Sequence, residues 1–164
     1  MSYYVEGITK GFPHASNCIF CISDPAIGTG PNGIEPERIL KEYENWWLVI
    51  QPKERRERLV LAAGLLVAKR AISVMSEATS EEFGEIIVVS DDASETLCNA
   101  VGATYTCQFR GGHSEGSEAG QSVPHAHYHL LPVCVEDPVE MKIGAGIGGA
   151  FGALRELRLG ITEQ

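Results

Sequence analysis

The chain has 164 residues, of which 44% are hydrophobic and 21% are charged. These proportions are typical of one soluble globular domain. The 22 acidic and 13 basic residues leave a net charge of -9 at pH 7, which repels duplex nucleic acid and anionic membranes. Proteins that coat either surface are therefore excluded, whereas a small phosphorylated ligand needs only a few local cations or backbone N–H groups.

The cysteines, at positions 18, 21, 98, 107 and 134, are odd in number and too sparse for a disulfide scaffold. We therefore expect a reduced, cytoplasmic protein. Residues 1–17 have no basic region followed by a long apolar core, so they do not resemble a secretory signal. The longest apolar run, 59–68, is about half the length of a membrane helix. We expect a single domain over residues 1–164 that does not enter a membrane.

The first predicted elements are a loop and three strands. Residues 28–36 concentrate Gly, Pro and Asn, which indicates a loop. Residues 38–44 and 46–52 carry aromatic and β-branched side chains around a polar turn, which predicts a hairpin. The apolar run over 59–70 predicts the third strand.

A helix is predicted next, over about 81–101, from its approximate helical stripe of apolar residues. Thr79 or Ser80 can cap it, and acidic residues in its first turn suit the helix dipole. Asp91 and Asp92 lie inside it, and a break into two pieces is left open there.

Two further strands are predicted at 104–110 and 122–133, joined by a glycine-rich loop over 111–120. Together the elements predict an α+β fold, with an antiparallel sheet of about five strands and a helix packed on one face.

Three of the five histidines lie within five positions, at His125, His127 and His129. On an extended strand these positions face the same side, about 7 Å apart in succession, so the three imidazoles would line one surface. The alternate positions carry residues that suit the core: Ala126, Tyr128 and Leu130.

Such a row has three uses. The histidines can be hydrogen-bonded strand residues, and two of them can share a metal ion with a distant ligand. The third use is nucleophilic attack on phosphorus by the middle imidazole, which is mostly neutral at pH 7. We favour this use, with His127 as nucleophile and backbone N–H groups of Gly120, Gln121 and Ser122 holding the phosphate oxygens.

The segment GQSVPHAHYHLLP, at 120–132, resembles the signature of the histidine-triad (HIT) superfamily. Cys18-Ile-Phe-Cys21 is similar to the amino-terminal Cys-x-x-Cys of many members, and 64–86 to their strand, Lys-Arg corner and helix entry. The likeness is strongest over 18–133, which makes 134–164 a carboxy-terminal extension. It implies a HIT-like fold, usually a homodimer, that hydrolyses or transfers nucleoside phosphates through a nucleotidyl-histidine intermediate.

The resemblance also implies residue roles. His127 matches the nucleophile, and His125 and His129 match the flanking histidines that orient it and contact the phosphate. Ser122 and Gln121 match the residues near the α-phosphate and the leaving group. Phe20 matches an apolar position that commonly lines the base pocket.

In zinc-containing members a histidine follows the Lys-Arg corner and joins both cysteines and the first triad histidine as a ligand. Here Ala71 takes that place, which leaves Cys18, Cys21 and His125 one ligand short. His14, His113 or a water can fill the gap, and the sequence does not select among them. We expect no required cofactor, with zinc as an addition at most.

Other departures concern the substrate. The position at which the family carries its ribose-binding acid falls near Val49. The asparagine that the family usually has before the triad loop is absent here, and the neighbouring residues include Gln108 and Arg110. Arg110 can donate two hydrogen bonds to a phosphate. We therefore expect an altered or larger substrate.

Two alternative functions stay open: a noncatalytic nucleotide-binding module and a zinc-dependent hydrolase.

Two weaker motifs are set aside. The mixed-charge run at 54–58 is interpreted as an exposed turn. Gly-x-Gly-x-x-Gly at 144–149 is rejected as a dinucleotide site, because no βαβ unit surrounds it.

Overall fold

The structure, a computed structural model, describes residues 18–20, 34–56 and 60–138. Five strands form one antiparallel sheet in the order β1-β2-β3-β5-β4. Their bounds are β1 (Ile39–Glu42), β2 (Trp46–Ile50), β3 (Gly64–Ala68), β4 (Tyr105–Gly112) and β5 (His127–Cys134). The α-helices are α1 (Lys53–Arg56) and α2 (Ser80–Ala100), and short 3-10 turns are η1 (Pro36–Arg38), η2 (Met75–Glu77) and η3 (Ser117–Ala119). The predicted fold class is confirmed.

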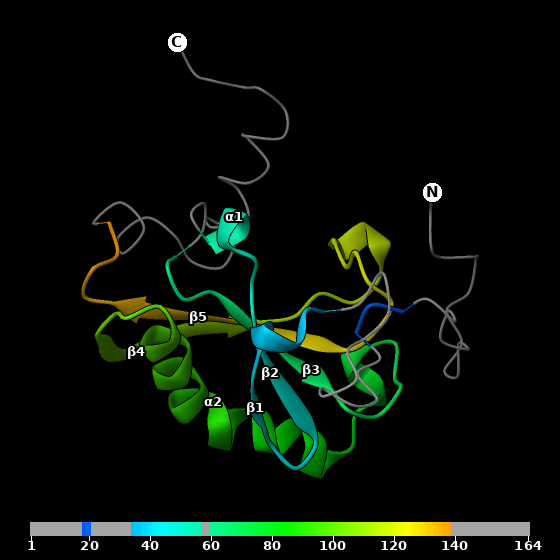
Figure 1. The fold of residues 1–164 in the computed structure, drawn as a ribbon. Coiled ribbons are helices and arrows are strands. Elements are labelled where there is room, and N and C mark those ends of the chain that lie inside the picture. The colour runs from blue at the N-terminus through cyan, green and yellow to red at the C-terminus, as the bar shows by residue number, and fades with distance from the viewer. Residues whose placement is uncertain (1–17, 21–33, 57–59, 139–164) are drawn as a thin grey trace.

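The sheet separates two layers (Figure 1). The long helix α2 lies against one face, and α1 lies on the other side of the sheet. Every residue of β2 and β3 is buried, because apolar clusters cover both faces. The larger cluster includes Trp46, Leu66 and Leu130 beneath α2, which explains why the sequence of these central strands is continuously apolar.

Pairing between β3 and β5 fixes the face on which the histidines lie. Val67 is opposite His127 and Leu65 is opposite His129, and paired residues share a face of the sheet. Leu65 and Val67 belong to the second apolar cluster, together with Phe20. The two strand histidines therefore face away from α2.

The predicted helix is confirmed as the single element α2, without a break at its paired aspartates. Thr79 and Glu82 form a capping box, in which each side chain accepts from the other residue's backbone N–H, at 3.2 and 2.7 Å. Asp91 accepts a hydrogen bond from the Tyr105 hydroxyl at 2.8 Å, and Asp92 is exposed on the surface. Side chains that point outward do not interrupt the helical backbone.

Strand β5 begins at His127, so the predicted start of this strand at Ser122 is wrong. Pro124 has no N–H to give to a ladder, and the His125 N–H donates to the Val123 carbonyl at 2.8 Å. The chain bends before it enters the sheet, and His125 consequently lies outside the strand.

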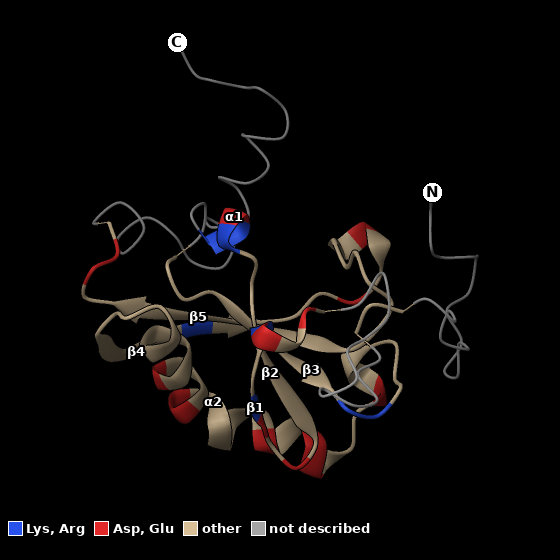
Figure 2. Ribbon diagram, viewed as in Figure 1, with Lys and Arg blue, Asp and Glu red and all other residues tan. Residues whose placement is uncertain are grey.

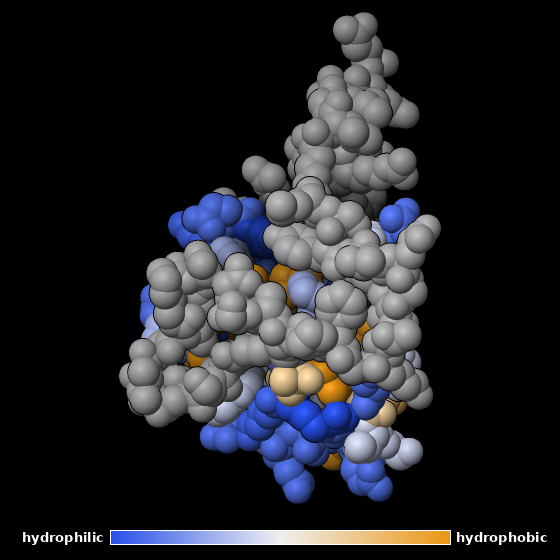
Figure 3. Space-filling model, turned by 90° about the vertical axis from the view of Figure 1, so that its right-hand side faces the viewer, coloured by the Kyte–Doolittle hydropathy of each residue, from blue (hydrophilic) through white to orange (hydrophobic). Residues whose placement is uncertain are grey.

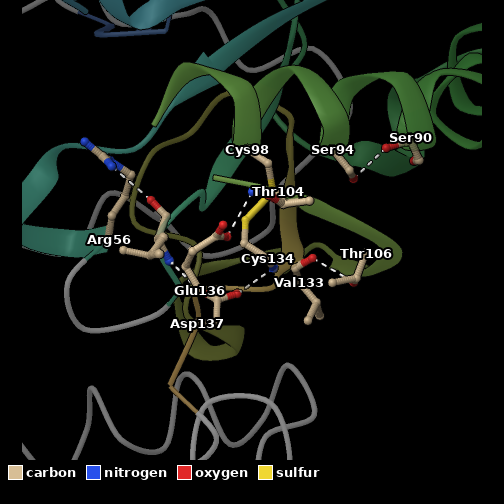
Figure 4. The surroundings of a disulfide bond; sticks show 11 residues. Arg56, Ser90, Ser94, Cys98, Thr104, Thr106, Val133, Cys134, Glu136 and Asp137 are labelled. Atoms are coloured by element: carbon tan, nitrogen blue, oxygen red, sulfur yellow. Dashed lines mark hydrogen bonds between the residues drawn. A yellow bond between two sulfur atoms is a disulfide. The ribbon is translucent and has the colours of Figure 1, made fainter. Parts of the chain in front are cut away.

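Cys98, in the last turn of α2, and Cys134, at the end of β5, form a disulfide (Figure 4). Both residues are fully buried. The expectation of a reduced protein is therefore wrong for this pair, which the topology brings together across 36 positions of sequence. Among the described cysteines, Cys18 and Cys107 are free.

Charged and polar residues dominate the described surface. Lys and Arg mark α1, whereas Asp and Glu recur along α2 (Figure 2). The side of the molecule seen in Figure 3 carries a dense hydrophilic area beside a small hydrophobic one. None of the helices in the described ranges has the length and apolar character needed to cross a membrane.

Candidate active site

A cavity of about 190 Å³ opens on the sheet face opposite α2. It brings together residues from the amino-terminal segment, the β2–β3 connection, the loop before β5 and β5 itself. Its lining is Ile19, Phe20, Ile34, Arg38, Gln51, Pro52, Arg55, Leu65, Ser122, Val123, His127 and His129. Four of the residues predicted from the sequence thus meet around one space.

His127 is held in one tautomer. Its Nδ1 lies 2.7 Å from the His125 carbonyl oxygen, and a carbonyl only accepts, so Nδ1 carries the proton and Nε2 keeps its lone pair. The residue is 8% exposed. Burial lowers the pKa of His127, the hydrogen bond to the His125 carbonyl raises it, and the charges of Arg55 and His113 lower it further. His127 is therefore a neutral imidazole with Nε2 available as a nucleophile.

His129 stands beside it, with ring centroids 5.2 Å apart. Burial, followed by the charges of His127 and Arg55, lowers the pKa of His129 to about 4. Two neutral imidazoles consequently border the cavity at neutral pH. The Phe20 and His127 rings pack edge to face, with centroids 5.1 Å apart, and Phe20 supplies an apolar wall.

His125 differs from the other two histidines because it is fully buried and does not line the cavity. Its Nε2 lies 2.7 Å from the Ala68 carbonyl oxygen, and its Nδ1 lies 3.6 Å from the Cys18 sulfur. The expected row of three imidazoles on one strand face therefore holds for His127 and His129 but not for His125. The contribution of His125 to the site is its carbonyl, which orients His127.

The loop before β5 uses most of its own donors. The Gly120 N–H donates to Ser117 and the Gln121 N–H donates to Gly116, both at 3.0 Å. The Gln121 side chain donates to Ser73 at 2.7 Å and to Val123 at 2.9 Å. Gly120 and Gln121 thus brace the loop, and their predicted N–H contacts to phosphate are not available in this arrangement.

Ser122 is exposed and lines the cavity. The glycine before Gln121 is required by the backbone, since Gly120 has φ +91° and ends η3. The Gly-Gln-Ser sequence therefore builds a tight turn whose last residue reaches the cavity.

A sequence model of the HIT domain matches residues 62–134, which contain all three histidines of the row. This segment of the chain therefore matches the histidine-triad (HIT) family. A search of curated proteins found no match. Solved structures of HIT proteins have the same fold as this chain.

A HIT family protein from Bacillus anthracis is 19% identical, with a TM-score of 0.54, and the alignment covers 90% of this chain and 99% of that one. A HIT family hydrolase from Clostridium thermocellum is 23% identical, with a TM-score of 0.50 and coverage of 76% and 96%. The NitFhit protein of C. elegans is 20% identical, with a TM-score of 0.48 over 77% of this chain. The chain spans only 28% of the length of NitFhit.

Two predicted substrate residues lie on β4, away from the cavity lining. Arg110 is half-buried and pairs with Leu131, which places it on the same face of the sheet as His129. Gln108 is exposed, in the irregular stretch where the β4–β5 register shifts. A role for either residue in substrate binding stays a prediction.

The donors expected for zinc do not assemble in the part of the chain that the structure describes. Cys18 and His125 meet, but Cys21 and His14 lie outside the described residues. Ala71 is exposed and offers no donor. Across the described ranges, no group of three or more His, Cys, Asp or Glu side chains could hold a metal ion. Zinc binding stays a prediction, and we derive no step through a metal.

A wider depression of about 630 Å³ lies at the start of α2, lined by Phe83 and His113 among others. The His113 ring also lies 6.4 Å from that of Tyr128, which packs against the core beneath α2. His113, considered as a replacement zinc ligand, is therefore on the α2 side of the sheet, whereas the active-site cavity lies on the other.

Sequence reasoning missed two arginines of the cavity, Arg38 and Arg55. Arg55 belongs to the mixed-charge run that we interpreted as an exposed turn. It is exposed, and it also lines the cavity. One signal could have placed Arg55 near the site. The run follows directly after β2, at the end of the sheet where Leu65 pairs with His129.

Proposed function

We propose that this protein is a nucleotide hydrolase or nucleotidyl transferase that attacks the α-phosphate of a nucleoside phosphate with His127. The observation that carries the proposal is the 2.7 Å hydrogen bond from Nδ1 to the His125 carbonyl. It leaves Nε2 as the free nitrogen of a neutral imidazole beside a cavity. The Clostridium structure is named a hydrolase, which supports the same reaction class.

In the first step the Nε2 lone pair forms a bond to phosphorus, and the bond to the leaving group breaks with its electrons on the leaving group. The imidazole then carries a positive charge, which the His125 carbonyl stabilises through the Nδ1 proton. In the second step a water oxygen attacks phosphorus and the P–N bond electrons return to Nε2. The water proton passes to solvent and neutral His127 is restored. A hydroxyl-bearing acceptor in place of water gives transfer instead of hydrolysis.

The apolar end of the cavity suits a nucleobase. Phe20, Ile19 and Ile34 line it, and Val49 lies buried in the same apolar cluster as Phe20. Because Val49 occupies the position expected for a ribose-binding acid, we propose that this site holds the sugar without a carboxylate from β2.

Rapid-quench sampling with an α-³²P-labelled nucleotide tests the proposed function. We expect label on His127 as an acid-labile, alkali-stable phosphoramidate, formed and lost at the rate of turnover. Tight binding without any adduct would instead identify a noncatalytic nucleotide-binding module. Undiminished turnover after prolonged chelation is also expected, and abolished turnover would favour the zinc-dependent hydrolase.

The activity should reach half of its maximum at a pH below the ordinary pKa of histidine. The nucleophile must be neutral, and burial together with Arg55 and His113 lowers the pKa of His127 from 6.5, while that of His129 falls to about 4. A lowered pKa means that protonation inactivates the site at a lower pH. We expect kcat/KM at pH 6.5 to remain above half of its value at pH 8. A profile that loses half its value at pH 6.5 would contradict this assignment.

We also propose a homodimer formed through β4. This strand lies at the edge of the sheet, which leaves backbone groups for pairing with a second copy. Phe109 on β4 and Ile87 on α2 are 40% and 67% exposed. Sedimentation at twice the 17.7 kDa chain mass supports this assembly, and monomeric behaviour refutes it.

A further inference from the structure

The cavity is lined by two guanidinium groups and, among the described residues of its lining, by no carboxylate. This is unusual in a chain whose net charge is -9. A concave site with cations and low-dielectric walls attracts anions more strongly than an open surface does. The two arginines nevertheless differ in what they already bind.

Arg38 is engaged within the protein. Its Nε donates to the Ile50 carbonyl at 3.0 Å, and its Nη1 forms an ion pair with Glu35 at 2.6 Å. The charge of Arg38 is therefore largely balanced before any ligand arrives.

Arg55 is positioned differently by its neighbour Arg56. The Arg56 guanidinium donates to the Gln51 and Leu61 carbonyls at 3.0 and 2.9 Å, which fastens α1 over the end of the sheet. Arg55 sits on the same turn and lines the cavity, and no ion pair joins it to a carboxylate in the described part of the chain. Its charge acts on both His127 and His129.

The pairing of β3 with β2 and β5 shows the order in which the lining residues follow one another along the cavity. Ser122 precedes β5 at its His127 end, and Phe20 contacts His127 and His125 there. The β2–β3 connection that carries Arg55 emerges where Ile50 pairs with Gly64, at the His129 end. A nucleoside held at Phe20 with its α-phosphorus at His127 thus directs whatever lies beyond that phosphorus toward Arg55.

We propose that Arg55 binds an anionic leaving group, so that the site selects nucleotides in which a second phosphate follows the α-phosphate. This inference rests on the proposed function and adds the substrate class to it. A guanidinium forms two parallel hydrogen bonds with a phosphate and remains charged throughout. It stabilises the oxygen that receives the electrons of the broken P–O bond, without giving up a proton.

The test compares two substrates, diadenosine tetraphosphate and an adenosine 5′-phosphoramidate with an uncharged amine. In Arg55→Ala we expect kcat/KM for the tetraphosphate to fall about 10- to 100-fold, and that for the phosphoramidate to stay within about twofold. Arg55→Lys should recover part of the loss. The control Lys53→Ala removes a charge from the same helix at a residue outside the cavity lining, and should change neither value. Equal losses on both substrates, or no loss on either, would overturn the proposal.

Binding separates this inference from the proposed function. Wild-type protein should bind the α,β-methylene analogue of ATP more tightly than AMP, and Arg55→Ala should remove that difference. A wild-type chain that forms the His127 adduct but binds both nucleotides equally overturns the role of Arg55 alone. A chain that binds neither nucleotide overturns both proposals.

Discussion

Replacing His127 with asparagine is expected to lower kcat/KM for nucleoside phosphates by at least about 10³-fold. The asparagine side chain is polar, and its amide nitrogen lies near the position of Nδ1 of histidine. It can therefore still donate to the His125 carbonyl. It has no nitrogen lone pair that can attack phosphorus. The fold should survive, because His127 lines the cavity and is not part of the hydrophobic cluster beneath α2.

The measurement is steady-state turnover together with thermal unfolding of the same sample. His113→Asn is the control, because it makes the same substitution at an exposed imidazole on the α2 side of the sheet. It should retain most of the activity. If His127→Asn kept the parental rate with an unchanged melting curve, the nucleophile would have been assigned to the wrong residue.

The sequence predicted the sheet well because its signals are local. The hairpin of β1 and β2 and the buried strand β3 follow from runs of apolar and β-branched residues, and Thr79, one of the two candidate caps, is the N-cap of α2. Alternation also placed His127 and His129 together correctly, since both lie within β5. The alternation failed for His125, because the chain bends after Pro124 and His125 does not pair as part of the strand.

The features that sequence reasoning missed depend on distant parts of the chain. Arg55 reaches the cavity because Arg56 anchors α1 to carbonyls on two segments, which charge patterning cannot reveal. The occupied donors of Gln121 depend on Ser73, which lies 48 positions away. Cys98 and Cys134 meet only because α2 packs along the strand that ends in Cys134.

Reduction of the disulfide should cost substantial stability. The bond joins residues 36 positions apart and thereby restricts the unfolded chain. A closed loop of that length corresponds to about 4 kcal/mol of unfolding free energy. The end of β5 has other supports (Figure 4): Asp137 accepts from the Cys134 N–H at 2.7 Å, and Glu136 accepts from the Thr104 N–H at 2.9 Å. We therefore expect the reduced protein to stay folded at 25 °C.

Thermal unfolding of oxidised and reduced wild-type protein measures this effect without changing any side chain. At this chain length about 4 kcal/mol corresponds to a fall in Tm of roughly 10 °C. The double variant Cys98→Ala with Cys134→Ala should melt at or below the reduced wild type, since it also loses two buried sulfur atoms. Cys107→Ala removes an exposed free thiol and should leave the difference intact. Turnover at 25 °C should be the same in both redox states, because the braces at Asp137 and Glu136 hold the strand that carries His127 and His129. Equal melting temperatures for the oxidised and reduced protein would mean that the two cysteines pack together without a stabilising cross-link.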